Sequence, residues 1–275
     1  MRRTYTGPVW IRGIIFLILG LIMVIPFLFM ISASFKPQAM ITTEPLKFIP
    51  DSFYGTNYKL ALEFPNFLRW YFNSVWMVLV TILLRMIVVT SAAYAFARLH
   101  IPGKNIIFVA LFSVWMVPPD TTLVARYLFI KTLGLYGSPW AVILNFTFDV
   151  FMLFMLRQFF MSVPKDLTEA GLIDGCSHFD IYRRIILPLT KPALVTMALF
   201  TFIWTWNSFM EPYVFIDTMA NQTLTVGLQY FQSRGGVDIG MMLAGATLGT
   251  MPVIFLFAFS QKYFIQGIAS SGIKG

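Results

Sequence analysis

Apolar residues in this sequence form long runs that are separated by shorter polar segments. A helix that crosses a bilayer needs about 20 mostly apolar residues. Six runs come close to or exceed this length: 13–35, 70–97, 105–119, 132–156, 192–210 and 239–261. No run shows the strict polar–apolar alternation of a half-buried strand. The pattern therefore predicts an all-α polytopic membrane protein with six transmembrane helices.

The first run has a second interpretation, because Arg2 and Arg3 precede it and small residues lie near its end. These features also occur in a cleaved signal peptide, whose apolar core is roughly 7–15 residues long. Residues 13–35 contain no charged side chain and exceed that length. We therefore expect a retained first span.

Composition supports a membrane protein and excludes a water-soluble globule. The 275 residues are 58% hydrophobic and 12% charged, whereas soluble domains carry about 25% charged residues. The net charge of +8 does not indicate nucleic-acid binding, because the basic residues flank the apolar runs and form no single patch. The single cysteine, Cys176, permits no disulfide within the chain, and no Cys/His pattern indicates a metal site.

The distribution of Lys and Arg predicts the orientation. With the N-terminus inside, twelve of these residues fall in inner segments, seven fall in outer segments and Arg85 lies within the second run. Loops on the cytoplasmic side carry the excess of Lys and Arg. Both termini are therefore expected in the cytoplasm.

The inner segment 162–188 reads as two short helices around a glycine turn. Ser162 is placed to cap the first helix, and Pro164 suits an opening turn because its missing N–H would be unpaired there. Gly175 suits the stop, where a left-handed backbone conformation is cheapest for glycine. We expect the first helix to end at this glycine.

Ser177, followed by Asp180 three residues later, marks the start of the second helix. Its apolar residues share one face: Phe179, Tyr182, Ile185 and Ile186. Arg183 and Arg184 lie opposite, and Pro188 is expected to end the helix. Such an amphipathic pair suits either a groove on a partner protein or the surface of the lipid bilayer.

The spacing in this segment resembles the EAA loop, the ATPase-docking loop of binding-protein-dependent ABC importers. The matching residues are Glu169, Ala170, Gly171, Asp174, Gly175, Ile185, Leu187 and Pro188. Further similarity to the carbohydrate branch, of the maltose-system MalG type, lies in the segments 73–74, 92–98, 102–104 and 261–275. The resemblance covers about 70–275, and it favours the groove on a partner protein over the lipid surface.

One position departs from the family pattern, because Gly171 stands where alanine is usual. Glycine costs up to about 1 kcal/mol of helix propensity relative to alanine. The substitution either loosens the first short helix or allows a close contact with the ATPase.

The resemblance implies an ABC type-1 permease fold in a bacterial plasma membrane, with a first segment 1–69, a transmembrane core 70–265 and a cytoplasmic tail 266–275. It implies a subunit of an ATP-driven sugar importer, with an oligosaccharide as the expected cargo. The implied ATPase-coupling residues are Glu169, Ala170, Gly171, Asp174, Gly175, Phe179, Tyr182, Leu187 and Pro188. A second permease would complete the pathway, ATPase subunits would bind inside, and a sugar-binding protein would bind outside.

The chain has no Gly-x4-Gly-Lys-Ser/Thr phosphate loop and no set of catalytic side chains. We therefore expect neither an enzyme nor a bound cofactor, and we expect ATP to bind a separate subunit. Alternatives are the same machinery carrying a polyol or a glycerol phosphate, a facilitator without an ATPase, and a membrane-anchored enzyme. The EAA-like loop speaks against the facilitator, and the missing polar catalytic cluster speaks against the enzyme.

Polar side chains inside apolar runs are costly, so they are candidates for the substrate pathway. The candidates are Arg85, Asn145, Asp149, Trp204, Asn207 and Glu211. Arg85 could instead form a buried ion pair with Asp149. The aromatic residues near the end of the fifth run could instead form an interfacial belt, an interpretation that we prefer for Tyr213.

Overall fold

Helices form most of the computed structural model, which describes residues 9–233 and 236–272. The chain divides into two compact units, 1–67 with 228–251 and 68–227 with 252–275, and each is described by itself. The longer helices are α1 (Val9–Ser34), α4 (Phe67–Arg98), α5 (Lys104–Trp115), α8 (Val150–Ser162), α12 (Lys191–Asn207) and α15 (Ile239–Gly272). The shorter α-helices are α2 (Gln38–Thr43), α3 (Thr56–Glu63), α6 (Leu123–Thr132), α7 (Pro139–Thr147), α9 (Lys165–Ile173), α10 (His178–Ile181), α11 (Leu187–Leu189), α13 (Met210–Phe215) and α14 (Leu224–Gly227).

The remaining regular elements are short. Three 3₁₀ turns cover Pro119–Thr122, Met219–Asn221 and Leu228–Tyr230, and one π turn covers Tyr182–Ile186. A minimal antiparallel ladder pairs β1 (Gln232–Ser233) with β2 (Gly236–Val237). The predicted all-α fold is confirmed apart from this two-residue ladder.

In the first unit, α1 is apolar around its whole circumference, as suits a helix surrounded by lipid. Its C-terminal end is held by the buried Asn57, whose amide donates to the carbonyls of Ser34 and Lys36 at 2.8 Å each. The last carbonyls of a helix lack partners within the helix. Asn57 therefore supplies the missing donors at this end.

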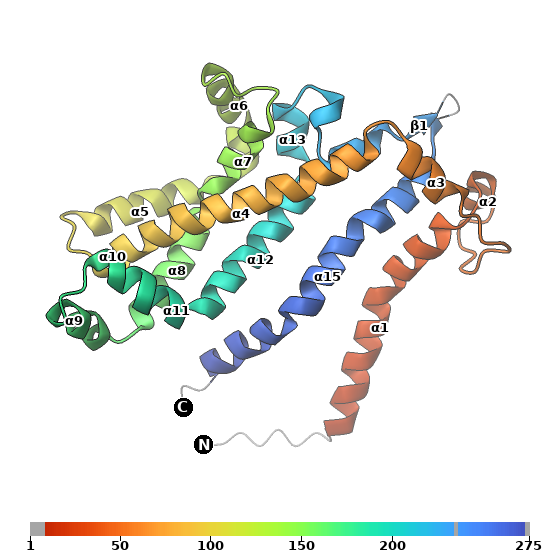
Figure 1. Cartoon of the computed structure of the whole chain (residues 1–275). Coiled ribbons are helices and arrows are strands. Elements are labelled where there is room, and N and C mark those ends of the chain that lie inside the picture. Colours follow the sequence, from red (N-terminus) through yellow and green to blue (C-terminus); the bar gives the residue numbers. More distant parts are fainter. Residues whose placement is uncertain (1–8, 234–235, 273–275) are drawn as a thin grey trace. The chain divides into compact units, whose positions relative to one another are not determined.

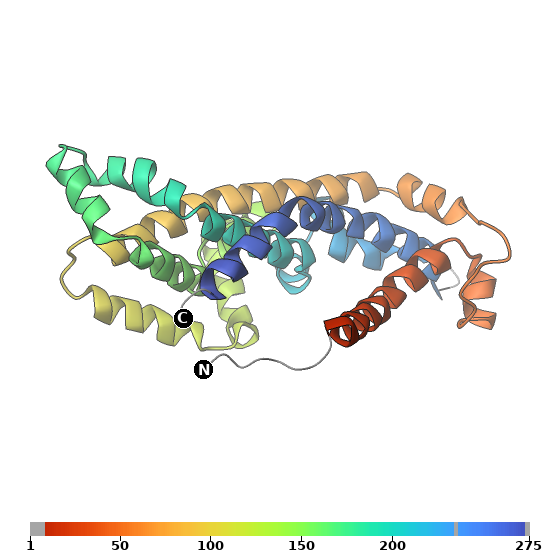
Figure 2. The ribbon, with the colours of Figure 1, turned by 90° about the horizontal axis from the view of Figure 1, so that it is seen from below.

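In the second unit, α8 packs against both α5 and α12 (Figures 1 and 2). Side chains of α4, α8, α10 and α12 share one apolar core with Leu153, Leu156 and Phe160 fully buried in it. The segments α9 to α11 lie at one end of α8 and α12, and α6, α7 and α13 lie at the other end (Figure 1). The unit therefore has a core of long helices with short helices at each end.

Within 9–233 and 236–272, four helical stretches are long and apolar enough to cross a membrane: Trp10–Ser34, Phe67–Arg98, Pro139–Ser162 and Ile239–Ser260. Two bent pairs raise the number to six if each counts as one span. They are Lys104–Trp115 with Pro119–Thr132, bent by 93°, and His178–Leu189 with Lys191–Asn207, bent by 80°. The six predicted spans fit this result.

The fourth span begins later than its apolar pattern indicates. The run suggested 132–156, whereas α6 ends at Thr132 and the next helix starts at Pro139. Gly134 and Gly137 adopt positive φ angles of 70° and 81°, which form the turn between these helices. Ser138 then caps the helix, so local turn chemistry overrides hydrophobicity here.

The contact around Asn57 in the first unit generates a stability prediction. A Cβ added at Gly240 would lie 2.7 Å from the Asn57 amide nitrogen, which is closer than real contacts allow. Gly240→Ala should displace this amide and leave the two carbonyls unpaired, at a cost of about 1–3 kcal/mol. The measurement is thermal unfolding of the detergent-solubilised protein. Gly55→Ala is the matched control, because nothing lies within 4 Å of its added Cβ; equal melting temperatures would contradict this account.

Candidate functional site

Segment 162–188 forms two short helices around a tight turn, as its sequence predicts. Gly175 has a positive φ of 79°, and Ser177 accepts a hydrogen bond from the backbone N–H of Asp180 at 3.1 Å. The Ser177 hydroxyl also donates to the Asp180 carboxylate. This hydrogen bond lowers the pKa of the Asp180 carboxyl, and the nearby Arg184, 3.4 Å away, acts in the same direction. Ser177 and Asp180 therefore both contribute to the cap at the start of the second helix.

Gly171 is buried where the first short helix approaches the second. A Cβ at this position would lie 3.1 Å from Ile181 and 3.3 Å from Ile185. Its carbonyl also accepts a hydrogen bond from the N–H of Cys176 at 2.9 Å. The glycine thus permits close packing inside the segment. This packing accounts for the departure from alanine without a loosened helix.

Two predicted boundaries in this segment are wrong. Ser162 ends α8 and donates to the carbonyl of Phe159, so it does not cap α9, which begins after Pro164 without a side-chain cap. Pro188 does not end the second helix, which continues to Leu189. The π turn Tyr182–Ile186 precedes this proline, and its wider spacing accommodates a ring that lacks an N–H.

Side chains of α4 hold the second short helix in place. The hydroxyls of Thr90 and Tyr182 lie 2.6 Å apart, and the hydroxyl of Tyr94 lies 3.3 Å from Nδ1 of His178. Ile186 is fully buried in the shared apolar core. The segment is therefore fixed to the long helices through both polar and apolar contacts.

Arg98, the last residue of α4, fastens the end of α8. Its guanidinium donates to the carbonyls of Phe160, at 2.6 Å, and Val163. These carbonyls lie in and just after the last turn of α8, where helical partners are missing. A cation is also favoured there by the helix dipole. Arg98 thus positions the start of the 162–188 segment.

The outer face of the segment is exposed and mixed in character. Its acidic and small residues Glu169, Ala170, Asp174 and Gly175 are exposed. Ile173 is 86% exposed and Phe179 is 66% exposed. Tyr182 and Leu187 are half-buried and Gly171 is buried, so these three shape the segment and contribute little to its outer face. Exposed apolar side chains beside a carboxylate are suited to contact with a partner protein.

Arg85 lies buried within the second unit, with a side chain that is 1% exposed. Its guanidinium donates to the carbonyl of Phe146, with Nε at 2.8 Å, and to the Thr201 hydroxyl at 3.1 Å. Phe146 lies in the last turn of α7. The side chain of Asp149 instead caps α8 by accepting from the N–H of Met152. Among the described residues, Arg85 is therefore held by a helix end, and no ion pair with Asp149 is formed.

A polar cluster at the other end of the unit joins two predicted pathway residues through Arg126. Its Nη1 lies 3.1 Å from the Asn145 amide oxygen and 3.4 Å from Oε1 of Glu211. Its Nη2 donates to the carbonyl of Pro119 at 2.9 Å. The hydroxyl of Ser208 donates to the second oxygen of Glu211 at 2.7 Å. This one guanidinium thus contacts α7, α13 and the 3₁₀ turn that precedes its own helix.

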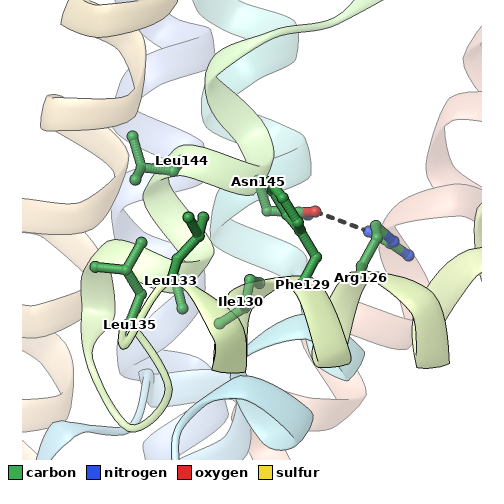
Figure 3. Close-up of a pocket in the computed structure, with 8 residues that line it drawn as sticks. Arg126, Phe129, Ile130, Leu133, Leu135, Leu144 and Asn145 are labelled. Carbon is green, nitrogen blue, oxygen red and sulfur yellow. Dashed lines mark hydrogen bonds between the residues drawn. The ribbon is translucent and has the colours of Figure 1, made fainter.

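Figure 3 shows a small pocket beside this cluster. The pocket has a volume of about 150 Å³, and apolar residues of α6 and α7 line most of it. Arg126 and Asn145 stand at one side of it. The pocket is small and mostly apolar, and the polar cluster beside it joins α6, α7 and α13.

The remaining pathway candidates lie on α12. Trp204 is 38% exposed and Asn207 is exposed. Trp206 is buried and stacks on Phe202 with ring centroids 5.5 Å apart, so it belongs to the core and not to an interfacial belt. Tyr213 is exposed, as a belt residue would be.

Comparison with known proteins places this chain in a family of membrane proteins. The family model described as "Binding-protein-dependent transport system inner membrane component" matches residues 6–270. The chain belongs to this family. It is therefore a multi-pass membrane protein and a permease subunit of the ABC transporter type.

Two relatives match over more than nine-tenths of their length. The permease is 35% identical to "Probable ABC transporter permease protein YurM" of Bacillus subtilis, over 100% of this chain and 91% of the relative. It is 30% identical to "Arabinooligosaccharides transport system permease protein AraQ" of Halalkalibacterium halodurans, over 98% and 99%. A crystal structure of a bacterial ABC transporter that imports the acidic polysaccharide alginate contains a chain of the same fold. Its TM-score is 0.83 at 22% identity, covering 92% of the permease and 95% of that chain.

Sequence reasoning missed Arg126 as a member of the polar cluster. It lies in a stretch that the pattern assigns to an outer segment, where basic residues are common. Its partners are 19 and 85 residues away along the chain, so no local spacing reveals them. The only available signal was a lone arginine between the Pro118–Pro119 pair and an apolar stretch.

The buried position of Gly171 generates a prediction for the permease. Gly171→Leu should push α9 away from Ile181 and Ile185, because overpacking typically costs 1–3 kcal/mol. Amide hydrogen exchange in 165–189 should then accelerate in the detergent-solubilised chain. Ala170→Leu is the matched control, because this neighbour is exposed. Equal exchange rates in the two variants would contradict the packing role.

The Arg126 cluster generates a second prediction. Arg126→Met should lower the free energy of unfolding by about 1–2 kcal/mol, because it leaves the half-buried carboxylate of Glu211 with fewer donors. Adding Glu211→Gln should recover part of this loss, since paired residues are not additive. Thermal unfolding of the single and double variants measures the coupling. Lys131→Met, at the exposed end of the same helix, is the control; a strictly additive double variant would argue against the contact.

Proposed function

We propose that this permease subunit belongs to an ATP-driven importer of oligosaccharides, works beside a second permease, and couples through 162–188 to a separate ATPase. The observation that carries the proposal is the coupling segment itself. Its outer face is exposed, with Glu169 beside apolar side chains, while its inner face is fixed to α4, α8 and α12. A rigid attachment lets a push on this face move the long helices.

The coupling residues named from the sequence divide into two kinds. Glu169, Ala170, Asp174, Gly175 and Phe179 are exposed and available to an ATPase cleft. Gly171, Tyr182 and Leu187 are buried or half-buried and shape the segment and its attachment, whereas Pro188 is exposed near the end of the second helix. This division supports Glu169 as the charged contact. It also assigns Tyr182 to force transmission through its hydrogen bond with Thr90.

The substrate class rests on relatives. One relative is named for the transport of arabinooligosaccharides, and a structural neighbour takes part in alginate import. We extend the class, an oligosaccharide, to this chain. A sugar-binding protein would deliver it from outside, and both termini would lie in the cytoplasm. The excess of Lys and Arg in the corresponding segments supports this orientation.

The coupling proposal predicts that Glu169→Lys abolishes uptake while the protein still inserts into the membrane. The lysine would put a positive charge where a carboxylate is proposed to contact the ATPase. Because this position is exposed, the buried core would stay undisturbed. ATP-dependent sugar uptake into proteoliposomes containing the whole complex measures the effect, and the membrane fraction measures insertion. Glu63→Lys is the control, since its carboxylate is exposed in a segment assigned to the outer side. Full uptake by Glu169→Lys would remove this docking contact.

Cross-linking tests the same contact directly. With Cys176→Ser as background, Ala170→Cys should cross-link to the ATPase subunit. Failure to capture the ATPase in an active complex would contradict the proposed docking face.

A panel of solutes tests the cargo: arabinotriose, chitobiose, maltose, sorbitol and glycerol 3-phosphate. We expect an oligosaccharide to stimulate ATP hydrolysis when its binding protein is present. Stimulation by sorbitol or glycerol 3-phosphate alone would replace the sugar assignment and keep the transport mechanism. Solute movement without ATP would contradict the proposal as a whole.

A further inference from the structure

Three helix breaks lie in the second unit, and the first of them forms one wall of an aromatic pocket. The breaks lie at 116–118 between α5 and the following 3₁₀ turn, at 148–149 between α7 and α8, and at 208–209 between α12 and α13. The pocket has a volume of about 390 Å³ and is lined by Trp115, Met116, Val117, Pro118, Pro119, Phe151 and Trp204. Small-molecule pockets typically measure roughly 300–1,000 Å³.

The aromatic rings of the pocket form a continuous surface. Trp115 and Phe151 stack with centroids 5.8 Å apart and planes inclined by 19°, and Phe151 and Trp204 lie 6.4 Å apart. Both tryptophans remain partly exposed, Trp115 by 47% and Trp204 by 38%. The pocket therefore offers flat aromatic faces that the surrounding protein leaves uncovered.

The irregular backbone of the pocket wall argues against lipid as its occupant. Within the hydrocarbon layer, non-helical backbone occurs only where it is buried in protein or lines a water-filled cavity. Residues 116–118 are non-helical, and the two prolines that follow Val117 lack N–H donors. The carbonyl of Pro119 is held by Arg126, so this wall is braced from behind. An open pocket with such a wall belongs on a hydrated pathway.

Two polar side chains lie close in sequence to the aromatic residues that line the pocket. Asn207 lies three residues after Trp204 and is exposed, so the two share a face of α12. Asp149 lies two residues before Phe151 and is half-buried at the second break. Apolar faces with a few placed polar groups are the usual composition of small-molecule sites. The C–H faces of a sugar ring suit the tryptophans, and its hydroxyls suit an amide and a carboxylate.

We infer that this pocket is a sugar subsite within this subunit, formed beside the break between α5 and the following 3₁₀ turn, with Trp115 and Trp204 as its stacking platforms. This inference rests on the proposed import of an oligosaccharide. It assigns direct contact with the transported sugar to this chain, and it adds Trp115 and Phe151 to the pathway. Asn207 contributes hydrogen bonds at the edge.

The test uses the complete transport complex in proteoliposomes, with the oligosaccharide of the panel that the wild type transports. Trp204→Ala and Trp115→Ala should lower the maximal uptake rate at saturating sugar-loaded binding protein roughly three- to tenfold, as loss of an aromatic contact of about 0.5–1.5 kcal/mol implies. Assembly of the complex should not change. Trp204→Phe should retain most of the rate, because it keeps an aromatic face.

Trp140→Ala is the matched control. This tryptophan is 43% exposed and has a ring contact with Trp76, but it lies outside the pocket. Equal uptake by Trp204→Ala and Trp140→Ala would overturn the subsite. So would loss of the second permease from the Trp204→Ala complex, because the pocket would then be an assembly surface.

The outcomes separate the two proposals. A wild-type complex that imports the sugar with ATP, beside pocket variants of unchanged rate, overturns the subsite and leaves the proposed function standing. A wild-type complex that moves no oligosaccharide overturns the proposed cargo and the subsite with it.

Discussion

The structure depends on satisfying the backbone carbonyls where helices end inside an apolar protein. A carbonyl without a donor is costly there, because no bulk water replaces the missing partner. In the second unit three arginines supply donors at such places: Arg85 at Phe146, Arg98 at Phe160 and Arg126 at Pro119. Each guanidinium presents several N–H groups in a fixed plane, so one side chain can serve two acceptors. Arg85 and Arg98 reach carbonyls 61 and 62 residues away, and Arg126 reaches one seven residues away, so charged side chains brace these breaks.

This constraint also explains how the coupling segment is attached. Arg98 fixes the end of α8 just before the segment begins, and Thr90 and Tyr94 hold its second helix. All three residues lie on α4, which therefore contacts both the entry to the segment and its far half. In the proposed coupling, a displacement of the outer face would be passed to α4 and α8 together, because the interior between them is densely packed and resists deformation.

The sequence predicts correctly those features of the structure that are determined by residues close together in the chain. The turn at Gly175 and the cap at Ser177 follow from backbone preferences of two or three residues, and the apolar runs follow from bilayer thickness. It does not predict features that depend on a partner residue far away in the chain. The role of Arg85 depends on a carbonyl 61 residues away, and the buried state of Gly171 depends on a contact with the next helix. The resemblance to ABC importers pointed to segments 73–74 and 92–98 as similar to the family, but it did not say what their side chains contact. In the structure Asn73 donates to the carbonyls of Ala220 and Gln222.

The two ends of the second unit use the same chemistry for different purposes. At the coupling end, Arg98 braces carbonyls beside a tightly packed segment in which even a methyl group at Gly171 is crowded, so the end behaves as a rigid body. At the other end, the carbonyl held by Arg126 belongs to a pocket wall that is open on its aromatic side. A transporter needs both properties, because force must enter through a part that does not yield and act on a part that changes shape. Broken helices supply the second property, since a break can alter its angle without unwinding the helices beside it. The arginine that braces the wall also pairs with Glu211, so one guanidinium ties the wall to α13.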